Sequence, residues 1–227
     1  MVNGSNNDRA FTLIELLVVI TIIAILMALL FPAFRGVQDQ AKRTQAKNDL
    51  TQIVTAVNAY YTDNGKLPVD NTKQGFDTLL GDPGGSYDNA LIFNPLRAIP
   101  DSNWNSANVL NPRQVAYLTA SDAKDQNSPK SGFAPKDTTV NGVAVKKGAF
   151  MDPWGNAYLV GIDSDYDGWT MDFIAYSDLS YTQKTGGAGS FPAVQGSSIS
   201  SSWGRDSKQG TNSDKKYKGS DDVISWQ

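Results

Sequence analysis

Three aspartates near the end of the chain could supply oxygen ligands to a metal ion. A polar loop separates Asp206 from the adjacent pair Asp221 and Asp222, so the three carboxylates converge only if that loop folds back. Calcium binds about six to eight oxygens, drawn from carboxylates, carbonyls and water. Acidic residues in polar loops are more often simply solvated. A calcium site and a solvated acidic loop are therefore the two interpretations of these residues.

A second acidic cluster consists of Asp163, Asp165 and Asp167, followed by Gly168. This pattern matches the start of an EF-hand calcium loop, in which alternate oxygens face the ion and glycine permits a sharp turn. The twelfth position of such a loop is normally Glu, but here it is Ile174. Because strands rather than helices are predicted on both sides, a polar hairpin turn is the favoured interpretation.

The composition excludes several kinds of chemistry. The chain has no histidine and no cysteine, which removes the usual general base, the Ser-His-Asp triad, the commonest zinc ligand and any disulfide. No disulfide can therefore hold a C-terminal loop in place, but a bound metal ion can do so. With a formal net charge of −3, the chain has no basic surface overall for nucleic acid. We expect neither a catalytic site nor a nucleic-acid partner.

The chain that must position these loops begins with a long apolar segment. It spans residues 11–34 and has one ionisable side chain, Glu15. A helix needs roughly 20 apolar residues to cross a bilayer. The apolar core of a signal peptide is shorter, about 7 to 15 residues, and precedes its small-residue cleavage site, whereas Ala10 lies before this segment. A plain membrane anchor explains the length but not Glu15, because a carboxylate in a spanning helix is costly unless it snorkels or finds a partner.

The motif that starts at Ala10 reads AFTLIELLVVI. It resembles the cleavage and methylation signal of type IV pilins and of type II secretion pseudopilins, although that family usually has glycine at the position of Ala10. The resemblance implies that a membrane-embedded prepilin peptidase cuts between Ala10 and Phe11 and methylates the new amino group of Phe11. It also implies that Glu15 meets the N-terminal amine of a neighbouring subunit in a filament. A buried ion pair of this kind is suited to fixing register.

The charges around the apolar segment conflict with that family's orientation. The leader has one arginine and one aspartate, whereas four basic residues follow the segment: Arg35, Lys42, Arg43 and Lys47. The positive-inside rule alone would place the downstream side in the cytoplasm. The resemblance implies the opposite, with the leader inside and the domain outside, because cleavage at Ala10 requires it. We therefore expect an inner-membrane anchor with a periplasmic domain.

A long helix is predicted to continue beyond the membrane. Pro32 should bend or loosen it. Apolar residues then recur at spacings of mostly three and four, which is typical of a helix resting on a core: Val37, Ala41, Ala46, Leu50, Ile53, Val54, Val57, Tyr60 and Tyr61. Asn64-Gly65 and Pro68 should end the helix. The expected organisation is a leader at 1–10, a transmembrane half-helix at 11–34 and a globular domain at 35–227, with the amphipathic half-helix at 35–64.

The rest of the chain resembles major pseudopilins in patches. The spine end at 47–68 is similar, and Gln74-Gly75-Phe76 with Leu79 and Leu80 looks like a short helix. Residues 81–148 match less well and read as an insertion of loops with short regular pieces. Met151–Tyr158 resembles the turn that opens the family's small sheet, and 157–162 and 172–176 read as its strands. The Gly- and Ser-rich segment 180–202 reads as a loop.

The C-terminal segments 202–210 and 221–226 are similar to the calcium loop of major pseudopilins. The resemblance implies that Asp206, Asp221 and Asp222 bind calcium, with backbone carbonyls near Trp203 completing the shell. The predicted fold is therefore an α+β pilin-like one, with a long spine helix against a small antiparallel sheet and a C-terminal metal loop.

The predicted function is that of a structural filament subunit, with a major pseudopilin that drives protein export as the first choice. Its expected partners are its own copies, minor pseudopilins, the prepilin peptidase, the inner-membrane assembly platform and, before assembly, membrane lipid. A type IV pilus subunit is the nearest alternative, although such subunits more often close the C-terminal loop with a disulfide. From another class, exposed Tyr, Trp and Asp could form a membrane-tethered carbohydrate-binding or hydrolase domain.

Overall fold

The computed structural model describes residues 12–70, 76–83, 85, 88–101, 103–186, 189–211 and 215–227. Its longest element is helix α1, Leu13–Asn64, with 52 residues. The chain divides into two compact units, Met1–Ala41 and Lys42–Gln227. Among the described residues, all strands and both acidic clusters lie in the second unit.

The first unit consists, in its described part, of the N-terminal part of α1 as far as Ala41. Every side chain described between residues 12 and 31 is exposed. Within the described residues, α1 is the one helix long and apolar enough to cross a membrane, judged by length and composition. The helix is continuous through Pro32. This portion has no packing partner within its own unit, as expected for a membrane anchor.

The second unit buries one stripe of α1. Leu50, Ile53, Val57 and Tyr60 are fully buried in the main core together with residues of the sheet and of α2. The predicted stripe is confirmed from Ala46 to Tyr60. The prediction extended it too far at both ends, because Val37, Ala41 and Tyr61 are exposed. The helix ends at Asn64 as predicted, and Gly65 follows it with a φ of +67° in the left-handed region that favours glycine.

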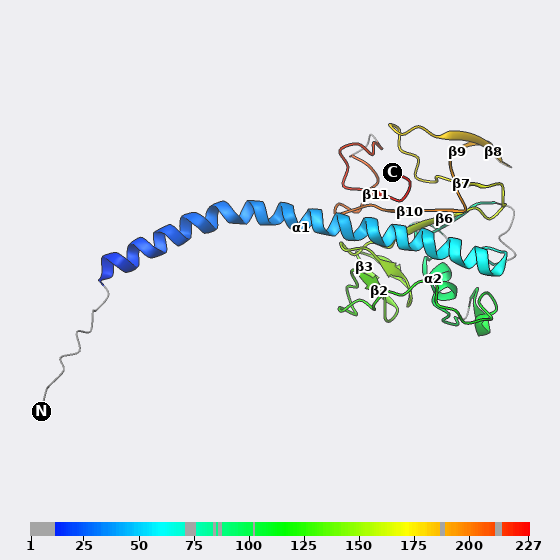
Figure 1. Cartoon of the computed structure of the whole chain (residues 1–227), viewed down its shortest axis with the longest axis horizontal. Coiled ribbons are helices and arrows are strands. Elements are labelled where there is room, and N and C mark those ends of the chain that lie inside the picture. The colour runs from blue at the N-terminus through cyan, green and yellow to red at the C-terminus, as the bar shows by residue number, and fades with distance from the viewer. Residues whose placement is uncertain are drawn as a thin grey trace, which may run out of the picture. The chain divides into compact units, whose positions relative to one another are not determined.

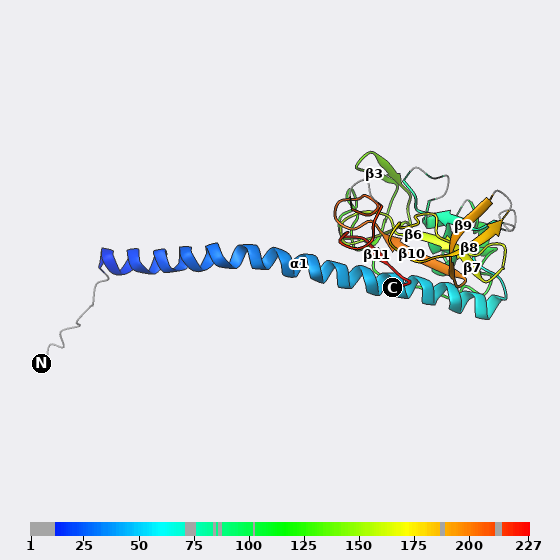
Figure 2. The ribbon, with the colours of Figure 1, turned by 90° about the horizontal axis from the view of Figure 1, so that it is seen from above.

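A four-stranded antiparallel sheet covers this stripe. Its strand order is β1-β6-β10-β11, with bounds Thr78–Leu80, Leu159–Ile162, Ser198–Ser202 and Val223–Ile224. Figure 1 shows β6 and β10 alongside the C-terminal part of α1, and in Figure 2 the strands lie on one side of that part. The sheet contributes Leu80, Val160 and Ile162 to the core. The pilin-like α+β prediction is confirmed.

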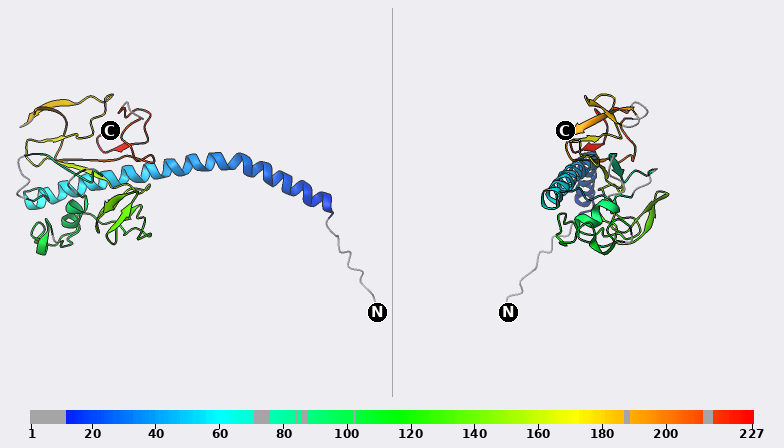
Figure 3. Two further views of the ribbon diagram at one scale, coloured as in Figure 1. Left: turned by 180° about the vertical axis from the view of Figure 1, so that it is seen from behind. Right: turned by 90° about the vertical axis from the view of Figure 1, so that its right-hand side faces the viewer.

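Smaller elements lie on both sides of this sheet (Figure 3). Helix α2 and the short 3-10 helix η2 span Ala90–Leu96 and Ser106–Asn108, and the two-stranded pairs are β2 with β5, Gly132–Phe133 and Phe150–Met151, and β3 with β4, Thr138–Val140 and Val143–Val145. A three-stranded sheet has the order β7-β9-β8, with bounds Trp169–Met171, Gly189–Gln195 and Thr182–Gly186. The segment 81–148 thus carries short regular pieces, as predicted.

The predicted loop at 180–202 was wrong, because this segment forms β8, β9 and β10. Strand β10 has the sequence SISSS, and all five residues are buried. Buried serines need partners for their hydroxyl groups. Ser200 donates to the backbone oxygen of Leu159 at 3.0 Å, and Ser202 donates to the Asp152 carboxylate at 2.6 Å. These bonds allow a polar strand in the centre of a sheet.

Three further local predictions were wrong. Residues 172–176 are not a strand; β7 ends at Met171, and the Asp172 carboxylate accepts a hydrogen bond from the backbone N–H of Ile174 at 2.9 Å, which forms a turn. The strands β6 and β7 also belong to different sheets, so they do not form a hairpin around 163–168. Leu79 and Leu80 lie in β1 rather than in a short helix, and Gln74 and Gly75 lie outside the described residues.

Candidate functional site

The structure brings Asp206, Asp221 and Asp222 together. Each offers a carboxylate oxygen, and these oxygens all lie within 4.8 Å of one another. Asp221 accepts hydrogen bonds from the backbone N–H groups of Arg205 and Asp206, at 2.5 and 3.0 Å. The loop therefore folds back, as convergence of the three carboxylates requires.

Asp222 is the buried member of this cluster. Its side chain is only 4% exposed, and one oxygen accepts hydrogen bonds from Gly210 N–H at 2.6 Å and from Tyr176 O–H at 2.7 Å. The other oxygen, Oδ1, is buried without a hydrogen-bond partner among the described residues. Burial raises the pKa of Asp222 to about 6, and the charges of Asp221 and Asp206 add to this effect, whereas the two hydrogen bonds oppose it.

An orphaned carboxylate oxygen beside two further carboxylates lacks a compensating positive charge. A calcium ion would supply that charge, and its preferred ligands are oxygens. The residues present therefore fit a calcium ion, with Asp222 as the innermost ligand.

Backbone geometry at Gly204 holds the two halves of this loop close together. Gly204 has a φ of +66°, and a Cβ built there would lie 2.3 Å from the backbone oxygen of Asp221. Only glycine fits such an approach. The Asn156 amide donates to the Gly204 carbonyl oxygen at 2.6 Å, and Ser207 donates to Asn156 at 2.6 Å. The loop is thus tied to the turn at 151–158 that the sequence identified.

That turn is organised by Asp152, a role that sequence reasoning missed. Asp152 is fully buried and accepts hydrogen bonds from three backbone N–H groups, those of Trp154 (2.9 Å), Gly155 (2.7 Å) and Asn156 (2.8 Å). It also accepts from Ser202 on β10 at 2.6 Å. The signal was present in the sequence, because Asp-Pro followed by Gly-Asn is a turn pattern in which the aspartate caps its own loop. Asp152 links the turn to the sheet and, through Asn156, to the C-terminal acidic loop.

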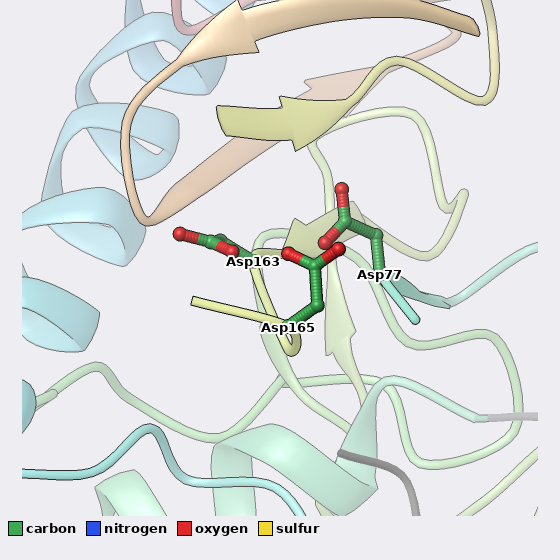
Figure 4. Close-up of side chains that lie close together, drawn as sticks. All are labelled: Asp77, Asp163 and Asp165. Carbon is green, nitrogen blue, oxygen red and sulfur yellow. The ribbon is translucent and has the colours of Figure 1, made fainter. Parts of the chain in front are cut away.

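The second acidic cluster has a different membership from the one predicted. Asp163 and Asp165 lie together, but their third member is Asp77, with the closest oxygens within 4.8 Å (Figure 4). The Asp167 carboxylate is not part of this group. It pairs with Lys184 at 3.5 Å and accepts a hydrogen bond from the Trp169 N–H at 2.8 Å. Asp77 immediately precedes β1, and β1 pairs with β6, which ends just before Asp163. No local pattern in the sequence could have joined residues so far apart.

In this second cluster Asp163 is organised by a polar turn, whereas Asp77 Oδ1 is, like Asp222 Oδ1, buried without a hydrogen-bond partner among the described residues. Both oxygens of Asp163 are already engaged, accepting from Asp167 N–H at 3.1 Å and from Gly168 N–H at 3.0 Å. Burial, reinforced by Asp165, raises the pKa of Asp163 to about 6. Burial likewise raises the pKa of Asp77 to about 7. Burial is the main cause of both raised pKa values, and the neighbouring carboxylates, held close by a turn and a strand pairing, add to it.

At the other end of the chain, Ala10 and Phe11 lie outside the described residues. Glu15 accepts hydrogen bonds from the Thr12 N–H at 2.9 Å and from the Thr12 hydroxyl at 2.7 Å, and the Glu15 N–H donates to that hydroxyl at 3.3 Å. This reciprocal pattern is a capping box at the start of α1. It offers the Glu15 carboxylate a partner within a single subunit.

Two family models match the chain. The model described as "Prokaryotic N-terminal methylation motif" matches residues 5–31, and the one described as "Type II secretion system (T2SS), protein G" matches residues 34–125. The second match includes the amphipathic part of α1 and extends into the segment 81–148. It ends before the acidic loops, so their function rests on their geometry.

Several curated proteins are similar to the chain. The type II secretion system core protein G of Pseudomonas aeruginosa is 43% identical over 79 residues, which is 35% of this chain and 54% of that protein. The core protein G of Klebsiella pneumoniae is 32% identical over 127 residues, or 55% of this chain and 89% of that protein. The fimbrial protein EcpC of Eikenella corrodens is 36% identical over 85 residues, or 37% of this chain and 54% of that protein. No solved structure matched the chain.

Proposed function

The chain belongs to the type II secretion system protein G family, and we propose from this that it polymerises into a pseudopilus that drives protein export. The observation that carries the proposal is the exposure of every described side chain of α1 from Leu13 to Phe31. Such a surface must lie in lipid or against other copies of itself. A filament built on bundled spine helices satisfies the second condition.

The proposed partners follow from the same features. The methylation motif at residues 5–31 calls for a prepilin peptidase. Filament growth calls for minor pseudopilins and an inner-membrane assembly platform. The spine segment supports an inner-membrane precursor with its domain in the periplasm, which becomes a periplasmic filament after assembly. The role is structural rather than catalytic.

The likeness to a fimbrial protein favours a type IV pilus subunit as the second candidate function. Deleting the gene should distinguish the two. A pseudopilin mutant should retain an exported enzyme inside the cell and keep its surface pili. Normal export together with lost piliation would favour the pilus function instead.

We also propose that calcium binds Asp206, Asp221 and Asp222, with backbone carbonyls near Trp203 as further ligands. The support is the convergence of the three carboxylates and the orphaned buried oxygen of Asp222. The turn with Asp163, Asp165 and Asp167 is the weaker candidate, because Asp163 is satisfied internally and Asp167 pairs with Lys184.

The first testable prediction concerns processing between Ala10 and Phe11. Protein recovered from assembled filaments should begin with an N-methylated Phe11, because the motif matches a cleavage and methylation signal. Mass spectrometry of the N-terminal peptide would measure this. An intact Met1 terminus in assembled filaments would contradict it.

The second prediction concerns Glu15. Glu15→Ala should insert into the membrane as well as the wild type, because a costly charge is gone, but it should assemble poorly for lack of a partner for the neighbouring amine. Thr12→Val is the matched control, since it disrupts the capping box and keeps the carboxylate. Filament yield and membrane fractionation measure the two effects. Equal loss of assembly in both variants would assign the role of Glu15 to helix capping.

A further inference from the structure

We propose that Arg43 and Lys47 of the spine helix position the C-terminal metal loop, so that calcium binding and attachment of this loop to α1 are coupled. This inference rests on the proposed calcium site and adds its positioning residues. Neither residue is a ligand; both act through the backbone that carries Asp221 and Asp222.

The contacts place the two basic side chains on either side of the acidic pair. The Arg43 guanidinium donates to the backbone oxygen of Ser220 at 2.5 Å. Lys47 Nζ donates to the backbone oxygen of Ile224 at 2.7 Å and also to that of Gln227. Ser220 directly precedes Asp221, and Ile224 lies two residues after Asp222. The acidic pair is therefore held from both directions along the chain.

The spacing on the helix explains why two residues can do this. Arg43 and Lys47 are four positions apart, so they project from the same face of α1 one turn from each other. On its other side the segment is held by the sheet, where β11 pairs with β10 through Ser201 opposite Ile224 and Ser202 opposite Val223. Residues 220–224 are thus fixed between α1 and β10.

Electrostatics favour the same arrangement. Three carboxylates within 4.8 Å repel one another, which opposes closure of the empty loop, and the hydrogen bonds from Arg43 and Lys47 to the adjacent backbone oxygens hold the loop closed against this repulsion. A hydrogen bond from a charged donor contributes more than one between neutral groups. Attachment should therefore preorganise the loop for the ion, and by reciprocity the ion should strengthen the attachment.

Two of the four basic residues after the apolar segment, Arg43 and Lys47, contact the folded domain. Loop positioning thus gives these two residues a role that is independent of membrane topology.

The test measures calcium affinity by isothermal titration calorimetry on the full chain in detergent micelles, after removal of metal with a chelator. Arg43→Gln with Lys47→Gln should raise the Kd for Ca²⁺ by about tenfold or more, within the range usual for coupled sites. Arg43→Lys with Lys47→Arg keeps both charges and should restore affinity to near the wild-type value. Arg35→Gln with Lys42→Gln is the matched control. It removes the same charge but leaves the hydrogen bonds of Arg43 and Lys47 intact, so it should leave the Kd unchanged.

The outcomes separate the two proposals. If the wild type does not bind calcium, the proposed metal site is wrong and the coupling falls with it. If the wild type binds and the Arg43/Lys47 double variant binds equally well, the metal site stands and the positioning role is wrong. If the double variant loses its folded circular dichroism spectrum, Arg43→Gln alone decides, with a raised Kd supporting the inference and an unchanged Kd overturning it.

Discussion

Asp152→Ala is expected to lower the free energy of unfolding more than any other single change considered. The substitution removes the side-chain acceptor of the Trp154 and Asn156 N–H groups and of the Ser202 hydroxyl at a fully buried position, whereas the Gly155 N–H keeps a bond to the Asp152 backbone oxygen at 3.2 Å. An unsatisfied buried polar group costs about 1–3 kcal/mol. Allowing for partial relaxation, the total loss should be about 3–5 kcal/mol, a large part of the stability of an ordinary domain.

Asp125→Ala is the matched control for this prediction. Asp125 also accepts from two backbone N–H groups of its own turn, those of Asn127 (2.8 Å) and Ser128 (3.1 Å), but it is exposed, so water can replace it. Urea unfolding followed by tryptophan fluorescence should show a small shift for Asp125→Ala and a large one for Asp152→Ala. Similar shifts in both variants would mean that burial of the aspartate does not determine how much unfolding free energy is lost.

Removing calcium should destabilise the domain by an amount that depends on ligand concentration. Binding to the folded state alone stabilises by RT ln(1 + [L]/Kd), about 2.7 kcal/mol at a hundredfold excess over Kd. The full chain in detergent should therefore show a higher melting temperature with calcium, reversed by chelation. Asp222→Asn should abolish that increase, because the amide keeps an acceptor for Tyr176 and Gly210 but places an N–H₂ group where the orphaned oxygen lies.

Asp165→Asn distinguishes the two acidic clusters. It alters the cluster of Asp77, Asp163 and Asp165 without affecting the C-terminal one, so its calcium-dependent increase in melting temperature should equal that of the wild type. A loss in Asp165→Asn but not in Asp222→Asn would move the site to the turn at 163–168. Identical melting curves with and without calcium in the wild type would exclude both clusters as structural metal sites.

Local pattern was enough to predict the spine helix and where it ends. The buried positions Leu50, Ile53 and Val57 recur at helical spacing, and Gly65 adopts the left-handed conformation expected of a helix cap. The convergence of Asp206 with Asp221 and Asp222 was also predicted, from a resemblance combined with the oxygen-rich chemistry that calcium prefers.

The errors arose where tertiary contacts override local signal. Strand β10 has neither alternation nor apolar character, and two of its serines, Ser200 and Ser202, are buried with Leu159 and Asp152 as hydrogen-bond acceptors. Asp77 lies next to Asp163 because β1 pairs with β6. Which strands pair depends on the whole sheet and cannot be inferred from the sequence around either aspartate. Asp172 looked like the start of a strand, but its side chain forms a turn with its own backbone.

The position of β11 in the sheet has a consequence for how the domain folds during synthesis. Arg43 and Ser220 are 177 positions apart, and β11 completes a sheet whose first strand is Thr78–Leu80. Folding dominated by such distant pairings is slow, of the order of milliseconds to seconds, because the entropy of closing long loops is lost before the stabilising contacts form. Chains emerge from the ribosome N-terminus first. The buried residues that cover the apolar stripe of α1 extend from Leu67 to Val223, so this cover is complete only when nearly the whole chain has been made. Until then the partly folded chain is exposed to aggregation and proteolysis.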